Sequence, residues 1–139
     1  MRSLKLHIST ILLAVGLVSQ SSAEMSVELN YLSSYSTGFY NAGGAEIASY
    51  DPETQRVFLT GAADNAVTIV DISNPDSPEL VTMIDLDAYG AGVNSVTVKN
   101  GIVAAAVEAS PKTDPGMVVF FNRLVTSSTP LESAHSPTW

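Results

Sequence analysis

Residues 57–84 read VFLTGAADNAVTIVDISNPDSPELVTMI, and this stretch decides the fold class. Runs of β-branched and other apolar residues alternate in it with clusters of Gly, Asn, Asp, Ser and Pro, which is the pattern of short strands joined by turns. An Asp-Pro pair at 51–52 starts a turn just before it. The pattern predicts strands at 57–60 and 67–72, and a strand at 80–84 that closes a four-stranded set.

A second set of strands follows the first. We expect strands at 93–98, 102–107 and 117–121. The turn Lys99-Asn100-Gly101 lies between the first two, and Asn-Gly favours a tight hairpin because both central residues of a type I′ turn need a positive φ. The whole chain therefore reads as all-β.

The two sets of strands repeat along the chain. Val57 and Val103 lie 46 residues apart, and Val67 and Met117 lie 50 apart. A four-stranded unit that recurs every 40–50 residues is typical of a β-propeller blade, and closed propellers contain about 4–8 blades. A chain of 139 residues holds about two such four-stranded antiparallel blades, so the sequence predicts an incomplete propeller.

The amino terminus, residues 1–23, has the pattern of a secretory signal peptide. Arg2 and Lys5 precede an apolar core, and Ser21 and Ala23 supply the small residues expected at positions −3 and −1, which predicts cleavage before Glu24. The core is shorter than the about 20 residues of a membrane-spanning helix, although a retained anchor remains the alternative. We therefore expect an exported protein, either periplasmic, secreted or at the cell surface.

Composition narrows the function classes. The chain has 6 basic and 14 acidic residues, and loss of Arg2 and Lys5 with the signal peptide takes the formal charge from −8 to −10. This acidity argues against nucleic acid as a partner, because a phosphate backbone needs clustered Lys and Arg. The chain has no cysteine, which excludes disulfides, thiolate metal sites and cysteine nucleophiles.

Residues 42–86 and 88–122 carry a family resemblance. The first contains the repeat core VTIVDISNPDSPELV at 67–81, and the second contains YGAGVNSV, KNGIVAAAVEA and KTDPGMVVFFN in that order. Residues 41–122 resemble the amino-terminal part of the choice-of-anchor I family, which is similar to the LVIVD-repeat propellers and to the mesenchyme-specific cell-surface glycoprotein. The resemblance implies an exported or cell-surface propeller, with blades over 24–122.

The tail, residues 123–139, departs from the family pattern. It reads RLVTSSTPLESAHSPTW, lacks strand alternation, and is expected to be disordered. A shift of the reading frame would account for the departure. Codons can be chosen for the tail such that the same bases, read two positions further on, encode IGNLLNSVGVGALPDM. We therefore expect a truncated propeller whose strand at 117–121 is an exposed apolar edge that invites self-association.

Few residues are candidates for chemistry. The two histidines fall in the signal peptide and in the tail, no serine lies in a Gly-x-Ser-x-Gly motif, and the aromatic residues between 24 and 41 are expected to pack between blades as a closing strand. No stretch has the acidic spacing of an EF-hand, and turn carboxylates more often bond to turn amides. The weak candidates for a calcium ion are the loop carboxylates Asp85, Asp87, Glu108 and Asp114.

Three functions remain open from the sequence. The favoured one is a non-catalytic binding module for an unknown extracellular ligand or envelope component. The resemblance also leaves open a fragment of an alkaline-phosphatase-like or nucleotidase-associated phosphoesterase, whose metal ligands would lie in blades that this chain lacks. The third is a structural or adhesion component of the cell envelope.

Overall fold

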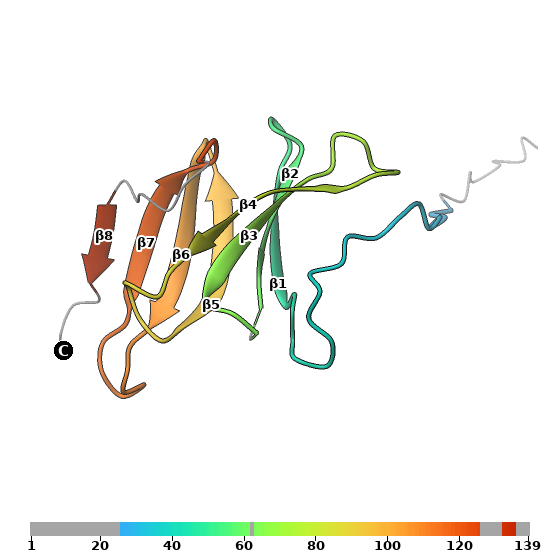
Figure 1. Ribbon diagram of the computed structural model, residues 1–139. Helices are drawn as coiled ribbons and strands as arrows, with labels where there is room; N and C mark the ends of the chain where they lie inside the picture. The colour runs from blue at the N-terminus through green and yellow to red at the C-terminus, as the bar shows by residue number, and fades with distance from the viewer. Residues whose placement is uncertain (1–25, 62, 126–131, 136–139) are drawn as a thin grey trace, which may run out of the picture. The chain divides into compact units, whose positions relative to one another are not determined.

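The computed structural model describes residues 26–61, 63–125 and 132–135 (Figure 1). The signal-peptide residues, including the predicted cleavage positions Ser21, Ala23 and Glu24, lie outside the described residues. The chain divides into Met1–Asn30 and a compact unit, Tyr31–Trp139, which contains all the strands that the structure describes. Within the described ranges there are eight strands and no helix: β1 (Ile47–Asp51), β2 (Arg56–Thr60), β3 (Ala66–Asp71), β4 (Glu79–Asp85), β5 (Gly92–Lys99), β6 (Ile102–Glu108), β7 (Met117–Asn122) and β8 (Glu132–His135).

The first sheet contains β1 to β4 in chain order, each strand antiparallel to the next. The predicted strands at 57–60, 67–72 and 80–84 correspond to β2, β3 and β4, with bounds that differ by one residue or so. Strand β1 was not predicted, because Asp51 was assigned to the turn that follows it. The structure instead ends β1 at Asp51, which is 5% exposed and pairs with Arg56 across the hairpin.

The second sheet contains β5 to β8, again in chain order and antiparallel. The predicted hairpin turn between β5 and β6 is confirmed: Asn100 has a φ of 52° and Gly101 a φ of 83°. Both values are the positive angles that a type I′ turn requires and that Asn and Gly tolerate. The turn therefore fixes the register in which Lys99 pairs with Ile102.

Four residues of the tail, Glu132–His135, form strand β8. Strand β8 pairs with the outer edge of β7, so the predicted 117–121 strand is not a free edge. The chain reverses directly after β7, where the Leu124 amide donates to Asn122 Oδ1 at 2.8 Å and the Val125 amide to the Asn122 carbonyl at 3.0 Å. The unpaired backbone groups along β7 are then available to the returning chain.

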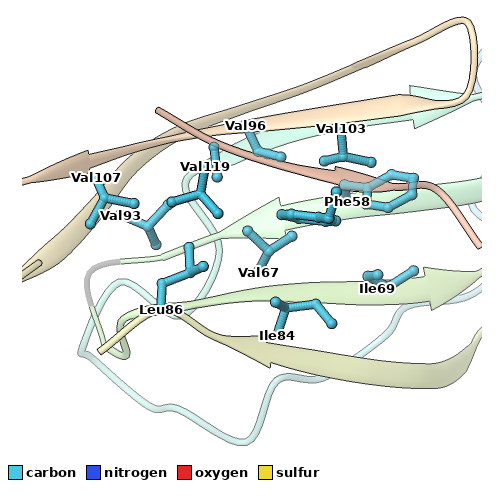
Figure 2. Packing of buried hydrophobic residues seen from close by; sticks show 12 residues of the cluster. Phe58, Val67, Ile69, Ile84, Leu86, Val93, Val96, Val103, Val107 and Val119 are labelled. Atoms are coloured by element: carbon cyan, nitrogen blue, oxygen red, sulfur yellow. The ribbon is translucent and has the colours of Figure 1, made fainter. Parts of the chain in front are cut away.

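One hydrophobic core joins the two sheets. Its members alternate along the strands, so each sheet turns one face to the other, and the first strand of the second sheet, β5, contacts β1, β2 and β3. Figure 2 shows these side chains between the sheets. The fully or almost fully buried members are Phe58, Val67, Ile69, Ile84 and Leu86 on one side, and Val93, Val96, Val103, Ala105, Val107, Val119 and Phe121 on the other.

The predicted repeat matches the topology. Val57 and Val103 lie in β2 and β6, the second strand of each sheet, and Val67 and Met117 lie in β3 and β7, the third strand. Two antiparallel four-stranded sheets packed face to face, which do not close on themselves, form an incomplete propeller-like fold. The predicted fold class is therefore confirmed.

Candidate functional site

The segment that carries the chain from the first sheet to the second borders the candidate site at its last two residues, Ala91 and Gly92. This crossover, residues 86–92, is held at both ends. The side-chain amide of Asn65 donates to the Gly90 carbonyl at 2.8 Å and to Asp87 Oδ1 at 3.2 Å, and the Ala91 amide donates to the Glu108 carbonyl at 2.8 Å. A turn of the first sheet and a strand of the second therefore position the crossover together.

Glycine at position 90 is required by this close approach. A Cβ atom there would collide with the Glu108 carbonyl oxygen and with the Val107 side chain. A Cβ atom at Gly92 would contact only the side chain of Glu108, whose nearest atom, Oε1 of the carboxylate, lies 3.1 Å away. Gly90 is therefore needed for the close packing of the backbone, whereas a side chain at Gly92 would meet only the side chain of Glu108.

A cleft of about 520 Å³ opens at this end of the two sheets. Both sheets contribute to its walls, and its lining is mostly polar backbone, amide and carboxylate groups. The side chains that carry this chemistry are Glu46, Asp64, Asn65, Asn94, Glu108 and Lys112.

Glu108 is the best-connected carboxylate of the cleft. Its Oε1 atom lies 2.9 Å from Lys112 Nζ, and its Oε2 atom accepts a hydrogen bond of 3.5 Å from the Asn94 side-chain amide. The hydrogen bond from Lys112 lowers the pKa of Glu108 below its ordinary value, the bond from Asn94 adds to this, and partial burial opposes both. Glu108 therefore remains ionised in the cleft at neutral pH.

Asp64 has the opposite environment. Burial raises the pKa of its carboxyl above the ordinary value, with only a weaker opposing bond to its own backbone. Asn65 next to it has a buried Oδ1 atom with no hydrogen-bond partner among the described residues. The turn between β2 and β3 thus places one carboxyl on the lining of the cleft, at Asp64, and one buried, unpartnered amide oxygen, at Asn65, next to it.

The four carboxylates predicted from the sequence for a calcium ion are placed differently. Asp85, the last residue of β4, accepts a 2.8 Å bond at its Oδ1 atom from the amide of Asp87 on the crossover, so these two residues lie together. Glu108 lines the cleft, and Asp114 lies in the loop after β6, where its amide donates to the Pro111 carbonyl. Over the described ranges, no group of three or more His, Asp or Glu side chains is arranged to hold a metal ion.

Sequence reasoning missed most of the cleft. Asn65 and Asp64 were interpreted only as part of a turn, and Asn94, Lys112 and Glu46 received no role. Asn65 and Asn94 lie 29 positions apart on different sheets, so no local motif connects them. The one feature of the sequence that could have indicated the cleft is the predicted repeat, because it brings corresponding ends of the two sheets together.

The opposite end of the sheets carries an ion-pair cluster rather than a cleft. Arg123, just after β7, lies 3.4 Å from Asp51 and also pairs with Glu53. The Thr54 hydroxyl bonds to Asp51 at 2.6 Å. This bond is the main cause that lowers the pKa of Asp51, the Arg123 charge also lowers it, and burial opposes both. The cluster fastens the second sheet to the first.

A smaller hollow of about 290 Å³ lies in the turn between β3 and β4. Asp71, one of its two carboxylates, accepts a 2.8 Å bond from the Ser73 amide. The hollow belongs to a single hairpin, and Asp71 and Asn74 bond to backbone amides within the turn.

Comparison with known proteins identifies one family. The family model described as the choice-of-anchor I domain matches residues 46–137, which is more than half of the chain. The match includes the tail beyond residue 122, where the sequence pattern was expected to end. No curated protein and no solved structure matches the chain significantly.

Proposed function

Because this chain belongs to the choice-of-anchor I domain family, a membership that indicates an association with the cell surface, we propose that it is an exported binding module without catalytic activity. Its binding site is the cleft between the two sheets, and its ligand is a component of the cell envelope. The observation that carries the proposal is the cleft itself, which is polar, open and built by both sheets.

The chemistry of the cleft fits a ligand rich in hydroxyl and amide groups. Glu108 offers carboxylate oxygens, Asn94 and Lys112 offer donors, and Asp64 offers a further acceptor. Groups of both kinds within one hollow can hydrogen-bond a polysaccharide or a peptide-bearing wall polymer. The crossover, which lines the cleft at Ala91 and Gly92, is fixed by hydrogen bonds of 2.8 Å that Asn65 and Ala91 donate, so little ordering is needed when a ligand binds.

Export is the second part of the proposal. It rests on the signal-peptide pattern of residues 1–23 together with the family's surface association. Among the residues that the structure describes, no helix is long and apolar enough to cross a membrane. When the chain is expressed in a bacterium, its exported form is expected to begin at Glu24, which amino-terminal sequencing or intact mass measures directly. An exported form that retains residues 1–23 contradicts the cleavage.

The binding proposal is tested by co-sedimentation of the purified chain with insoluble bacterial cell-wall material. The test variant is Asn94→Ala, whose exposed side chain makes a single long bond of 3.5 Å within the protein, so the fold should tolerate the change. The matched control is Asn100→Gly, which keeps the positive φ at the turn on the far end of the second sheet.

We expect the wild-type chain and Asn100→Gly to sediment with the wall material, and Asn94→Ala to bind at least several-fold more weakly. Equal binding by all three proteins contradicts the cleft as the site. Release of phosphate from a phosphate ester by the purified chain, lost on removal of metal ions, contradicts the non-catalytic role and favours the phosphoesterase alternative.

A further inference from the structure

The cleft between the two sheets carries more negative than positive charge. Its lining includes the carboxylates of Glu46, Asp64 and Glu108 and a single cationic side chain, that of Lys112. Lys112 forms an ion pair with Glu108, and among the residues that the structure describes no ion pair involves Glu46 or Asp64. The described part of the protein therefore supplies one cation for three carboxylates.

The ammonium group of Lys112 marks where the cleft holds a positive charge. Its Nζ atom lies 2.9 Å from Glu108 Oε1, which is the length of a charge-assisted hydrogen bond. The two partners differ in exposure, since the Lys112 side chain is 79% exposed and the Glu108 side chain 23%. Glu108 is the last residue of β6, whereas Lys112 lies in the loop that follows. The sheet thus fixes the carboxylate, and its cation reaches it from the solvent.

An ammonium group from outside the protein can replace that of Lys112 with little loss of stability. Exposed ion pairs between Lys and a carboxylate stabilise a protein only slightly, because water and salt screen the charges and the long side chain loses freedom. The space beside Glu108 Oε1 is also free of a side chain from residue 92, which is a glycine. A Cβ atom there would lie 3.1 Å from this oxygen.

Asp64 favours a cation in the same cleft. Burial raises the pKa of its carboxyl, because desolvation disfavours the charged form. A positive charge that enters the cleft offsets this effect, whereas an anionic group adds repulsion between like charges. The environment of Asp64 therefore selects against anionic ligands and for cationic ones.

From the excess of carboxylates in the lining and the exposed ion pair, we propose that the cleft binds a ligand with a primary ammonium group, which takes the place of Lys112 on Glu108. The ammonium group belongs either to an amino sugar or to the side chain of a peptide. The hydroxyl and amide groups of the same ligand bond to neighbouring groups such as Asn94. This specificity rests on the binding function proposed above and adds the charge of the ligand to it.

The test compares ligands that differ only in their amines. The first pair consists of glucosamine oligosaccharides with free amines and oligosaccharides of the same length in which every amine is acetylated. The second pair is a short peptide with a free lysine side chain and the same peptide with that lysine acetylated, so the two pairs separate the two sources of the ammonium group. Isothermal titration calorimetry with the purified chain is run at about 0.15 M salt, where the Debye length is about 8 Å and long-range attraction to the acidic chain is screened.

Two variants, each with a matched control, locate the ammonium group. Glu108→Gln keeps the size of the side chain and removes its charge, and Glu79→Gln makes the same change at the exposed start of β4. Lys112→Met removes the competing cation, and Lys99→Met removes an equal charge at the exposed end of β5. Because the Lys112 side chain is 79% exposed, its replacement leaves the fold intact even where Glu108→Gln does not fold.

We expect the free-amine form of one pair to bind about tenfold more tightly than its acetylated form, and Glu108→Gln to abolish that difference. Lys112→Met should bind the free-amine form several-fold more tightly than the wild type, while both controls bind as the wild type does. Equal gains for Lys112→Met and Lys99→Met overturn the proposal, because they indicate attraction to the acidic surface as a whole.

Two outcomes separate this specificity from the binding function on which it rests. If the acetylated forms bind as tightly as the free amines, or no probe binds while the chain still sediments with cell-wall material, the ammonium specificity is wrong and the binding function stands. If the chain neither binds a probe nor sediments with wall material, both are wrong.

Discussion

The packing of the two sheets against each other predicts the effect of Phe58→Ala. Phe58 is fully buried in β2, and it belongs to the cluster that both sheets share (Figure 2). Truncation of a buried Phe to Ala costs about 3–5 kcal/mol, since it removes buried apolar surface and leaves a cavity. Domains of this kind have a free energy of unfolding of about 5–15 kcal/mol, so the loss is a large fraction of the total.

The prediction extends to both sheets because the cluster is common to them. Amide hydrogen exchange of the wild type and of Phe58→Ala should report the loss in two places: at Ile69 in β3, which pairs with Phe58, and at Ala105 in β6 of the second sheet. The control is Tyr40→Ala, whose side chain is 95% exposed and whose truncation should change the stability by less than about 0.5 kcal/mol. If protection falls at Ile69 but stays unchanged at Ala105, the two sheets are stabilised independently, and the reasoning from a shared core fails.

Two further predictions concern the ends of the sheets. Asp51→Asn should lower the free energy of unfolding by about 1–3 kcal/mol at pH 7. The pKa of Asp51 is lowered in the folded state. Its contribution to the free energy of unfolding is therefore present above its ordinary pKa of 3.8 and is lost as the pH falls below that value. Urea unfolding from pH 7 to pH 3 should show a weaker pH dependence in Asp51→Asn than in the exposed-loop control Asp114→Asn, and identical slopes contradict the argument. Gly90→Ala should destabilise the chain by about 1–3 kcal/mol, because its Cβ meets the backbone of Glu108. Gly92→Ala, whose Cβ would meet only the Glu108 side chain, at 3.1 Å or more, should cost less, and equal melting temperatures for the two variants refute the close approach.

Much of the fold could be predicted because its signals are local. The turn at Asn100 and Gly101 needs positive φ angles, which these residue types supply. The strands β2, β3 and β7 have apolar runs bounded by turn residues. The spacing of Val57 and Val103 then revealed that one unit follows another, which local signals alone do not show.

The remaining features depend on contacts that the sequence does not display. Strand β8 forms where the pattern lacks alternation, because the free edge of β7 and the turn at Asn122 bring the chain back. Strand β1 was missed because Asp51, followed by a proline, is a residue type that is common in turns. In the structure this residue ends the strand and is buried against Arg123. The cleft combines side chains of both sheets, and only the packing of the sheets places Asn65 near Gly90.

The central claim, that this surface module binds its ligand in the cleft, is tested most directly by nuclear magnetic resonance. Backbone amide signals of the wild-type chain are followed while soluble fragments of bacterial cell wall are added. The account predicts that the signals of Asn65, Gly92 and Asn94 shift in proportion to the bound fraction, while those of Asn100 and Gly101, at the other end of β5, stay in place. Shifts confined to Asn100 and Gly101, or no shifts at saturating fragment concentrations, would contradict it.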